Sequence, residues 1–282
     1  MKWAVVTDSA SDMACMKSEL SDEVAFDTVA LKLNVGDKEF VDDEKLNVGD
    51  MMKALASHSG KSGSAAPSPG EWKDAFEKAD NIVAITISSA LSGSYSSAQA
   101  GMNMVLEEYP DKKVLLIDSK STGGGMMLMA KKALELAKQN VDFDTMKAEM
   151  DKYYNKVKVL FVLENMDNLM KNGRISKFEG SMAAILGIKV MGEGSAEGTL
   201  NVLKKARGKM QAYDKLLERL YEKGYQGGRI IIGHCNNEQK ADYLKTKVLE
   251  RFEKAKIEVC RLRGLDSFYA ENGGIIVGYE IA

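Results

Sequence analysis

The chain has 282 residues, of which 45% are hydrophobic and 28% are charged, and its formal net charge is −2 at pH 7. This composition is ordinary for a globular protein, and the length predicts two domains. The nearly balanced charge argues against binding nucleic acid through bulk positive charge, so we expect no nucleic-acid partner.

Short apolar runs alternate with helical patterns in the first half of the chain. Apolar runs at 2–8, 82–88 and 113–118 each end in Asp or Ser, and helical patterns follow at 94–109 and 125–138. This alternation predicts a mostly parallel sheet with flanking helices. Ligands bind outside the carboxyl ends of such strands, so we expect the polar pairs at 8–9, 88–89 and 118–119 to converge on one crevice.

Residues 57–70 read as a loop, because two of the three prolines lie there among glycines and serines. Loops on a rigid scaffold often carry binding residues. Gly60-Lys61-Ser62 is reminiscent of a phosphate-binding P-loop, but Leu55 stands where the first glycine is required and a helical pattern precedes it. We therefore reject a P-loop.

The second half also alternates strands and helices. Strands are predicted at 157–164, 200–206, 229–234, 256–261 and 274–280, and helices at 165–172, 209–223 and 238–255. The glycines at 192–198 predict a hairpin turn and not a dinucleotide motif, because no switch from strand to helix brackets them. We expect an α/β protein of two domains, an N-terminal one at 1–156 and a C-terminal α/β domain at 157–282.

A cluster of hydroxyls stands where the strand at 82–88 gives way to a helix. The free N–H groups and positive dipole of a helix N-terminus, together with the hydroxyls of Ser92 and Ser94, suit a carboxylate or a phosphate. The alternative that these serines only cap the helix stays open. The same turn would also serve a binder of small anions or sugar phosphates, because an anion site alone does not choose its ligand.

A serine hydrolase is a less favoured alternative. It needs a base beside the nucleophile, but the chain has only His58 and His234, and no Gly-x-Ser-x-Gly motif surrounds Ser92. His234 and Cys235 are adjacent but lack a third ligand, so we expect no metal and no cofactor. The three cysteines form neither a CxxC pair nor an even-numbered framework, which favours a reducing cytoplasm. No long apolar stretch follows a basic start, and we expect neither a signal peptide nor a membrane span.

Several separated segments together follow a known pattern. In chain order they are Thr7-Asp8-Ser9, Pro67-Ser68-Pro69-Gly70-Glu71, Ile87-Ser88-Ser89-Ala90-Leu91-Ser92-Gly93-Ser94-Tyr95, Asp118-Ser119, Gly123-Gly124-Gly125 and Leu169-Met170-Lys171-Asn172-Gly173-Arg174-Ile175-Ser176. Over nearly the whole chain, this combination resembles the DegV family of bacterial fatty-acid-binding proteins. The resemblance implies a long-chain fatty acid in a tunnel between two α/β domains, the first holding its head group and the second covering its acyl chain. It also implies a non-catalytic subunit that presents the carboxylate to a separate fatty acid kinase, which makes acyl phosphate from ATP.

The resemblance also implies roles for individual residues around the head group. Ser92 matches the serine that hydrogen-bonds the carboxylate, and the amides of Gly93 and Ser94 lie beside it. Ser64 matches a threonine that supplies a second hydroxyl, and the substitution keeps the donor.

Three further positions carry over from the family pattern. Arg174 matches an arginine near the head group, and Arg207 matches a surface arginine associated with kinase docking. Tyr269 takes the place of a histidine, and this departure is expected to change the head-group geometry or the ligand preference. The glycines at 123–125 likewise replace a serine-containing turn.

Overall fold

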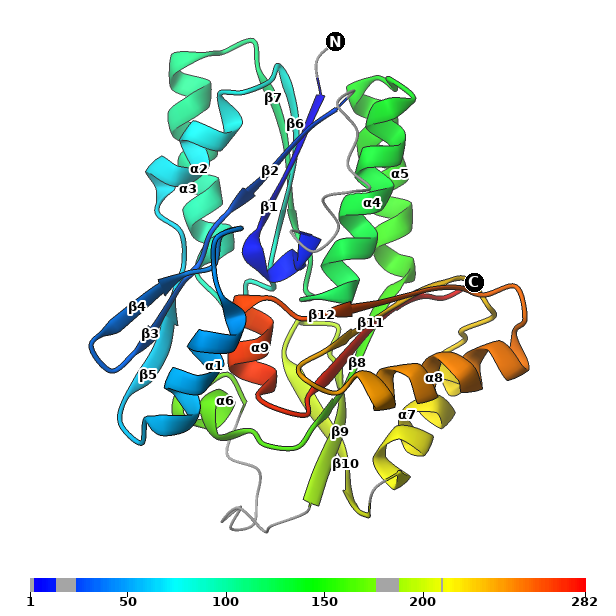
Figure 1. Ribbon diagram of the computed structural model, residues 1–282. Helices are drawn as coiled ribbons and strands as arrows, with labels where there is room; N and C mark the ends of the chain where they lie inside the picture. Colours follow the sequence, from blue (N-terminus) through cyan, green and yellow to red (C-terminus); the bar gives the residue numbers. More distant parts are fainter. Residues whose placement is uncertain (1–2, 14–23, 176–187, 209) are drawn as a thin grey trace.

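The computed structural model describes residues 3–13, 24–175, 188–208 and 210–282 (Figure 1). Within these ranges the chain forms a parallel sheet, a small antiparallel sheet and a mixed sheet, with helices packed against them. Cys15, Ser176 and Lys209, which the sequence analysis used, lie outside the described residues. No helix in the described part of the chain combines the length and the apolar composition needed to cross a membrane.

The parallel sheet has the strand order β2-β1-β6-β7 and confirms the expectation for the first half. Its strands are β1 (Trp3–Asp8), β2 (Ala25–Val29), β6 (Asn81–Thr86) and β7 (Lys113–Asp118). Strands β1 and β6 are buried along their whole length, as expected when helices cover both faces. Their alternate residues pack into two separate apolar clusters, one on each face of the sheet.

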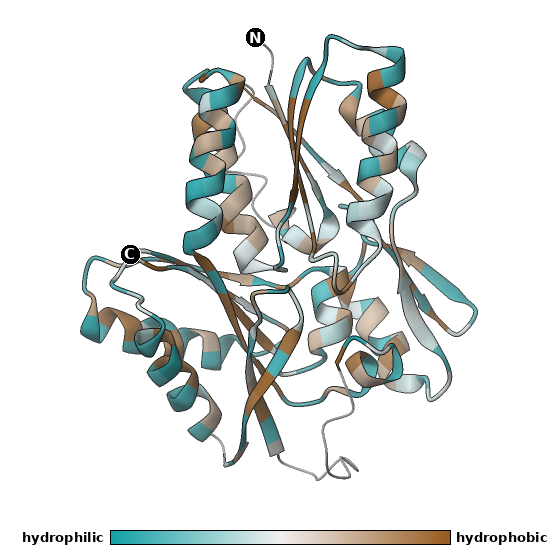
Figure 2. Ribbon diagram, turned by 180° about the vertical axis from the view of Figure 1, so that it is seen from behind, coloured by the Kyte–Doolittle hydropathy of each residue, from teal (hydrophilic) through white to brown (hydrophobic). Residues whose placement is uncertain are grey.

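Helices lie on both faces of this sheet (Figures 1 and 2). Helices α2 (Pro69–Phe76) and α3 (Ser94–Glu108) cover one face, and α4 (Gly124–Lys138) and α5 (Phe143–Lys156) cover the other. The small antiparallel sheet, β4-β3-β5, extends to one side and consists of β3 (Lys32–Val35), β4 (Lys38–Val41) and β5 (Ser62–Ala65). Helix α1 (Val48–Ser57) stands between β4 and β5 in the chain.

The mixed sheet contains the described strands that follow residue 156, in the order β10-β9-β8-β13-β11-β12. They are β8 (Val157–Leu163), β9 (Ile188–Gly194), β10 (Leu200–Arg207), β11 (Arg229–His234), β12 (Lys256–Arg261) and β13 (Ile275–Glu280). Helices α7 (Gln211–Glu222) and α8 (Glu238–Arg251) pack on one face. The other face meets α6 (Asp167–Lys171) and α9 (Gly264–Ala270). The expected hairpin between β9 and β10 is present.

The two large sheets are joined through the start of α4. A methyl group built on Gly278 of β13 would lie only 2.1 Å from the carbonyl carbon of Gly124, so the two backbones cross with no room for a side chain. Helix α9 also links the halves, because it packs on α1 and on the short 3₁₀ helix η1 (Ser9–Ser11). Because these contacts join the two halves closely, the division of the chain into two domains at residues 156 and 157 stays a proposal.

Two expectations were wrong in detail. Residues 62–65, predicted as loop, form β5, whose backbone pairs with β3 although its Ser-Gly-Ser-Ala sequence has no strand pattern. Helix α8 ends at Arg251, short of the predicted residue 255. Strands β2, β3 and β4 and helices α2, α5 and α9 were not predicted. All of these except α5 are short, and the positions of the strands and of α9 depend on partners distant in sequence.

Candidate ligand-binding site

A cavity lies between the two halves, with a volume of about 650 Å³ counted out to its mouth. Most of its wall is aliphatic or aromatic, and residues from both halves contribute, among them Leu31 and Ile87 from the first and Val159, Phe161 and Ile276 from the second. The polar residues in the wall are Ser64, Ser92, Thr122, Arg174, Asp266 and Tyr269.

Four of these polar residues gather at one end of the cavity. The Ser64 hydroxyl on β5 is 2.8 Å from the Tyr269 hydroxyl on α9, across 205 positions of sequence. The segments around them also touch: a methyl built on Gly93 would lie 3.9 Å from Ala66, and one built on Gly63 would lie 3.1 Å from the Asn172 side chain. These contacts bring β5, the Ser92 segment and the Arg174 segment together, so the cavity has a polar end, and the rest of its described wall is apolar except for Thr122 and Asp266.

Ser92 lies in the serine turn (residues 88–93), which connects β6 to α3. Its Oγ accepts a hydrogen bond from the Ser94 amide at 3.2 Å, so it caps the start of the helix. A hydroxyl that accepts one bond still has its own proton to donate. Ser92 can therefore cap α3 and donate to a ligand at the same time, and the two alternatives left by the sequence are compatible.

Gly93 and Ser94 do not face the cavity as Ser92 does. Gly93 is the N-cap residue of α3, and Ser94 is fully buried with its hydroxyl donating to Asp8 Oδ2 at 2.6 Å. As far as the described residues define the cavity wall, it includes neither of them. The hydroxyl that the sequence analysis offered to an anion is thus engaged with Asp8.

The Asp8 carboxylate holds both ends of the serine turn. Its Oδ2 accepts bonds from the Ile87 amide at 2.8 Å and from the Ser94 hydroxyl, while Oδ1 accepts from the Ala10 amide at 3.2 Å. Asp8 is completely buried, and this burial raises its pKa to about 7, although the hydrogen bonds act in the opposite direction. Asp8 therefore positions Ser92 without lining the cavity.

The other polar strand ends also bond within the protein. Asp118 accepts from the amide of Ser89 at 3.0 Å and from its hydroxyl at 2.5 Å. The Ser88 hydroxyl donates to the Gly198 carbonyl at 2.7 Å, which ties the serine turn to the hairpin of the mixed sheet. Asp8, Ser88 and Asp118 thus shape the serine turn, and none of the residues at 8–9, 88–89 and 118–119 lies in the described cavity wall.

Arg174 reaches the polar end of the cavity from the segment after α6. Its Nε donates to the Leu91 carbonyl at 3.1 Å and a terminal nitrogen donates to the Asn172 carbonyl at 2.5 Å. Because both acceptors are neutral, these bonds orient the guanidinium without cancelling its charge. Arg174 is thus fixed beside Ser92 as a positive group.

Arg207 lies elsewhere, at the exposed end of β10. Its strand also exposes Lys204 and Lys205, so a basic surface borders the hairpin. This position is separate from the cavity wall defined by the described residues.

The residues considered for hydrolysis or metal binding have other roles. His234 Nδ1 accepts from the Asn237 amide at 3.3 Å, in the turn before α8, and burial lowers its pKa. Cys235 is buried, which raises the pKa of its thiol and disfavours the thiolate. Across the described ranges, no group of three or more His, Cys, Asp or Glu side chains could hold a metal ion.

Sequence reasoning missed Thr122 and Asp266. The Thr122 hydroxyl donates to Asp266 Oδ1 at 2.6 Å, and both residues line the cavity. Asp266 precedes Tyr269 by three positions and therefore shares a helix face with it. That spacing was available in the sequence, but it has meaning only once residues 264–270 are known to be helical.

Comparisons with known proteins agree with this architecture. A family model described as "Uncharacterised protein, DegV family" matches residues 2–280. A DegV domain-containing protein of Streptococcus gordonii is 40% identical over 281 residues, which cover 100% of both chains. Among solved structures, the Streptococcus pneumoniae Fatty Acid Kinase (Fak) B3 protein loaded with linoleic acid is 40% identical with a TM-score of 0.96, and the match covers 100% of both chains.

A second solved structure, a DegV family protein from Eubacterium eligens loaded with heptadecanoic acid, is 35% identical with a TM-score of 0.93. The match covers 99% of this chain and 100% of that one. Family model, curated relative and solved structures agree over essentially the whole length, and the chain belongs to the DegV family.

Proposed function

We propose that this protein binds a long-chain fatty acid, with the carboxylate at Ser64 and Ser92 and the acyl chain along the apolar wall. The observation that carries the proposal is the cavity itself, which has hydroxyls and a guanidinium at one end and a mostly apolar wall elsewhere. Two similar proteins, at 40% and 35% identity, hold linoleic and heptadecanoic acid, which supports this class of ligand.

The energetics favour an acyl chain over a small anion. Each buried methylene contributes roughly 0.8 kcal/mol, so a long chain supplies the larger part of the binding free energy. The head-group contacts then need only orient the carboxylate. A small anion or sugar phosphate would leave the wall formed by Val159, Phe161 and Ile276 without an apolar partner.

We also propose that the protein presents the bound carboxylate to a partner kinase and performs no catalysis itself. The hydroxyls of Ser64, Ser92 and Tyr269 are neutral donors, which leave a carboxylate more nucleophilic than a bidentate ion pair would. Gly93 would contribute through its amide at the start of α3, Ser94 through the hydrogen bond from its amide to Ser92 Oγ, and Arg207 through docking of the kinase at the basic end of β10. A cytoplasmic location belongs to the same proposal, because the kinase would use ATP.

Extraction of the purified protein tests the ligand. Mass spectrometry of an organic extract is expected to detect long acyl chains, and the delipidated protein is expected to bind linoleic acid again. A clean extract together with no binding of added linoleic acid would contradict the proposal. A purified chain that consumed ATP without a partner would contradict the division of labour. Release of p-nitrophenol from acyl esters, abolished by Ser92→Ala, would favour the hydrolase alternative.

A further inference from the structure

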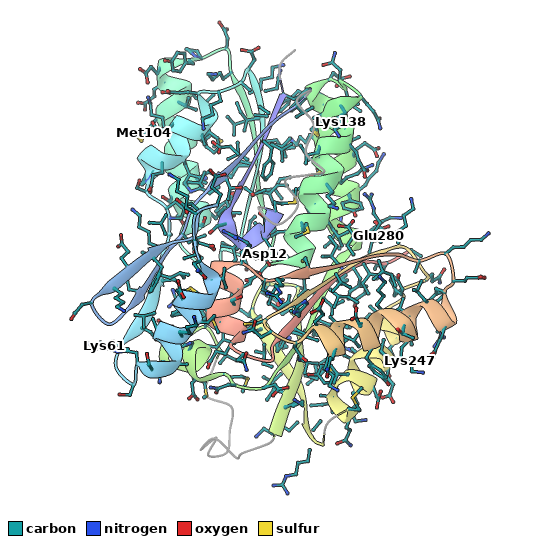
Figure 3. All side chains as sticks on the ribbon, viewed as in Figure 1. Asp12, Lys61, Met104, Lys138, Lys247 and Glu280 are labelled. Atoms are coloured by element: carbon teal, nitrogen blue, oxygen red, sulfur yellow. The ribbon has the colours of Figure 1, made fainter. Side chains whose placement is uncertain are left out.

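Two buried carboxyl groups meet where the halves of the molecule join, one from the end of η1 and one from α9. Asp12 is 1% exposed and Asp266 is 4% exposed. Figure 3 labels Asp12 at the centre of the molecule, beside η1. A methyl group built on Gly123, just before α4, would lie 2.7 Å from Asp266 Oδ2 and 3.6 Å from Asp12 Oδ2. The Oδ2 atoms of the two side chains therefore approach the same point, and both atoms are buried.

The remaining oxygens of this pair already have donors. Asp12 Oδ1 accepts from the Arg263 amide at 2.7 Å, and Asp266 Oδ1 accepts from the Thr122 hydroxyl at 2.6 Å. No hydrogen-bond donor among the described residues reaches Asp266 Oδ2. An ionised carboxylate only accepts hydrogen bonds, so a bond between two carboxyls requires a proton on one of them. Two carboxyl oxygens that approach one buried point, with no donor to Asp266 Oδ2, are therefore accommodated by one shared proton.

The surrounding charges favour retention of that proton. Asp8 and Asp42 are also buried, and their negative charges act on Asp266 together with its own burial, which raises its pKa to about 7. Arg263, the cation beside α9, acts on Asp42 and donates to the Asp43 carbonyl.

Charged side chains on the other elements packed against α9 are engaged elsewhere. Lys32 of β3 pairs with Glu71, and Asp50 and Lys53 of α1 pair with each other. Asp167 and Lys171 of α6 act on Glu271. The buried acidic groups at this junction are therefore Asp8, Asp12, Asp42 and Asp266, together with the Cys235 thiol, on which the charge of Asp12 acts.

We propose that Asp12 and Asp266 share one proton and that the resulting hydrogen bond is a positioning device, which fixes α9 and thereby holds Tyr269 at the polar end of the cavity. Asp266 and Tyr269 share a helix face and both line the cavity. Loss of the proton would leave two adjacent carboxylates, whose repulsion pushes α9 away from η1. The consequence for the ligand rests on the proposed function, whereas the shared proton does not.

Two isosteric variants test this pair. In Asp266→Asn the amide nitrogen donates permanently to Asp12 and the oxygen still accepts from Thr122, and Asp12→Asn is the converse. Both variants are expected to fold at pH 6. Thermal unfolding of ligand-free protein is compared from pH 6 to pH 8.5, with Asp111→Asn on an exposed turn as the control. The wild type and the control are expected to lose stability relative to both amide variants as pH rises.

The second measurement is the affinity of the delipidated proteins for linoleic acid over the same range. Wild-type affinity is expected to fall between pH 6 and pH 8.5 on the order of tenfold more than that of Asp266→Asn, since the change passes through a pKa of about 7. Parallel unfolding profiles, or failure of both amide variants to fold at pH 6, would overturn the shared proton. If the stabilities of the wild type and Asp266→Asn diverge with pH while their affinities for linoleic acid change in parallel, the positioning role is overturned. No binding by the wild type at pH 6 would instead contradict the proposed function, and the unfolding comparison would still decide the proton.

Discussion

The two walls that meet at the polar end of the cavity are both held by buried carboxylates, but over very different distances in sequence. The serine turn is held by Asp8, 79 positions from Ile87. Helix α9 is held by Asp42, which accepts from the amides of Gly264 at 2.9 Å and Leu265 at 2.8 Å, 222 and 223 positions away. The first wall belongs to a parallel sheet whose strands are visible in the sequence. The second exists only because distant segments pack together.

Replacing Asp8 by alanine is expected to have the largest effect. It leaves the Ile87 amide and the Ser94 hydroxyl buried without their acceptor, at a cost of about 3 kcal/mol in unfolding free energy. Denaturant unfolding measures this loss. Asp118→Ala, which removes a partly exposed carboxylate from the same turn, is the matched control and should cost less than about 1 kcal/mol. Equal losses would mean that Asp8 has no special role in holding the serine turn.

Replacing Asp42 by alanine tests the other wall. Two amides at the start of α9 lose their acceptor, and we expect a cost of about 2 kcal/mol. Asp43→Ala is the control, because Asp43 accepts from the exposed Lys45 amide at 2.9 Å. If α9 is the less firmly held wall, Asp42→Ala should also increase hydrogen exchange within residues 264–270 while leaving α3 protected. Equal exchange in both helices would remove the distinction between the walls.

The dependence of unfolding free energy on pH below about 7 tests the environment of Asp8 on the serine-turn side. Burial raises the pKa of folded Asp8 from 3.8 to about 7, so the folded state binds a proton more tightly than the unfolded state does. The stabilisation that protonated Asp8 gives the folded state is therefore complete below about pH 4. It is lost as pH rises to about 7, and the loss in unfolding free energy is a few kcal/mol at most. Chemical unfolding of the wild type and of Asp8→Asn at several pH values measures the difference. A difference that stays constant with pH would contradict the raised pKa.

The same contrast explains what the sequence could predict. The continuous apolar runs of β1, β6 and β7 indicate buried parallel strands, and the helical period of α3 follows from its own residues. Strand β5, with the sequence Ser-Gly-Ser-Ala, is formed by pairing with β3, which no local pattern encodes. Helix α9 has seven residues and no side-chain cap of its own, so it depends on Asp42.

The candidate site divides in a similar way. The serine turn and its place at a strand end follow from the sequence, whereas Ser64 and Tyr269 were named only through the family resemblance. Their 2.8 Å contact could not be predicted, because it joins β5 to α9, and neither of these elements was predicted from the sequence. The role of all these residues in binding a ligand stays a prediction.

Replacing Ser92 by alanine tests ligand binding on the serine-turn side. The variant removes one donor to the carboxylate and the acceptor for the Ser94 amide, and we expect about tenfold weaker binding of linoleic acid. Fluorescence displacement or calorimetry measures the affinity, and Ser96→Ala on the exposed face of α3 is the control. Unchanged affinity would place the head group elsewhere.

Replacing Tyr269 by phenylalanine is expected to have the smallest effect, about threefold in affinity, because Ser64 keeps its hydroxyl for the carboxylate and the aromatic ring stays packed on Phe268. The difference from Ser92→Ala follows from how the two hydroxyls are held. Ser92 is fixed by the amide of Ser94, whereas the Tyr269 hydroxyl is bonded to Ser64, a hydroxyl that can rotate. A loss for Tyr269→Phe that equals or exceeds the loss for Ser92→Ala would reverse this order. It would show that the wall assembled from distant segments, and not the serine turn, sets the position of the head group.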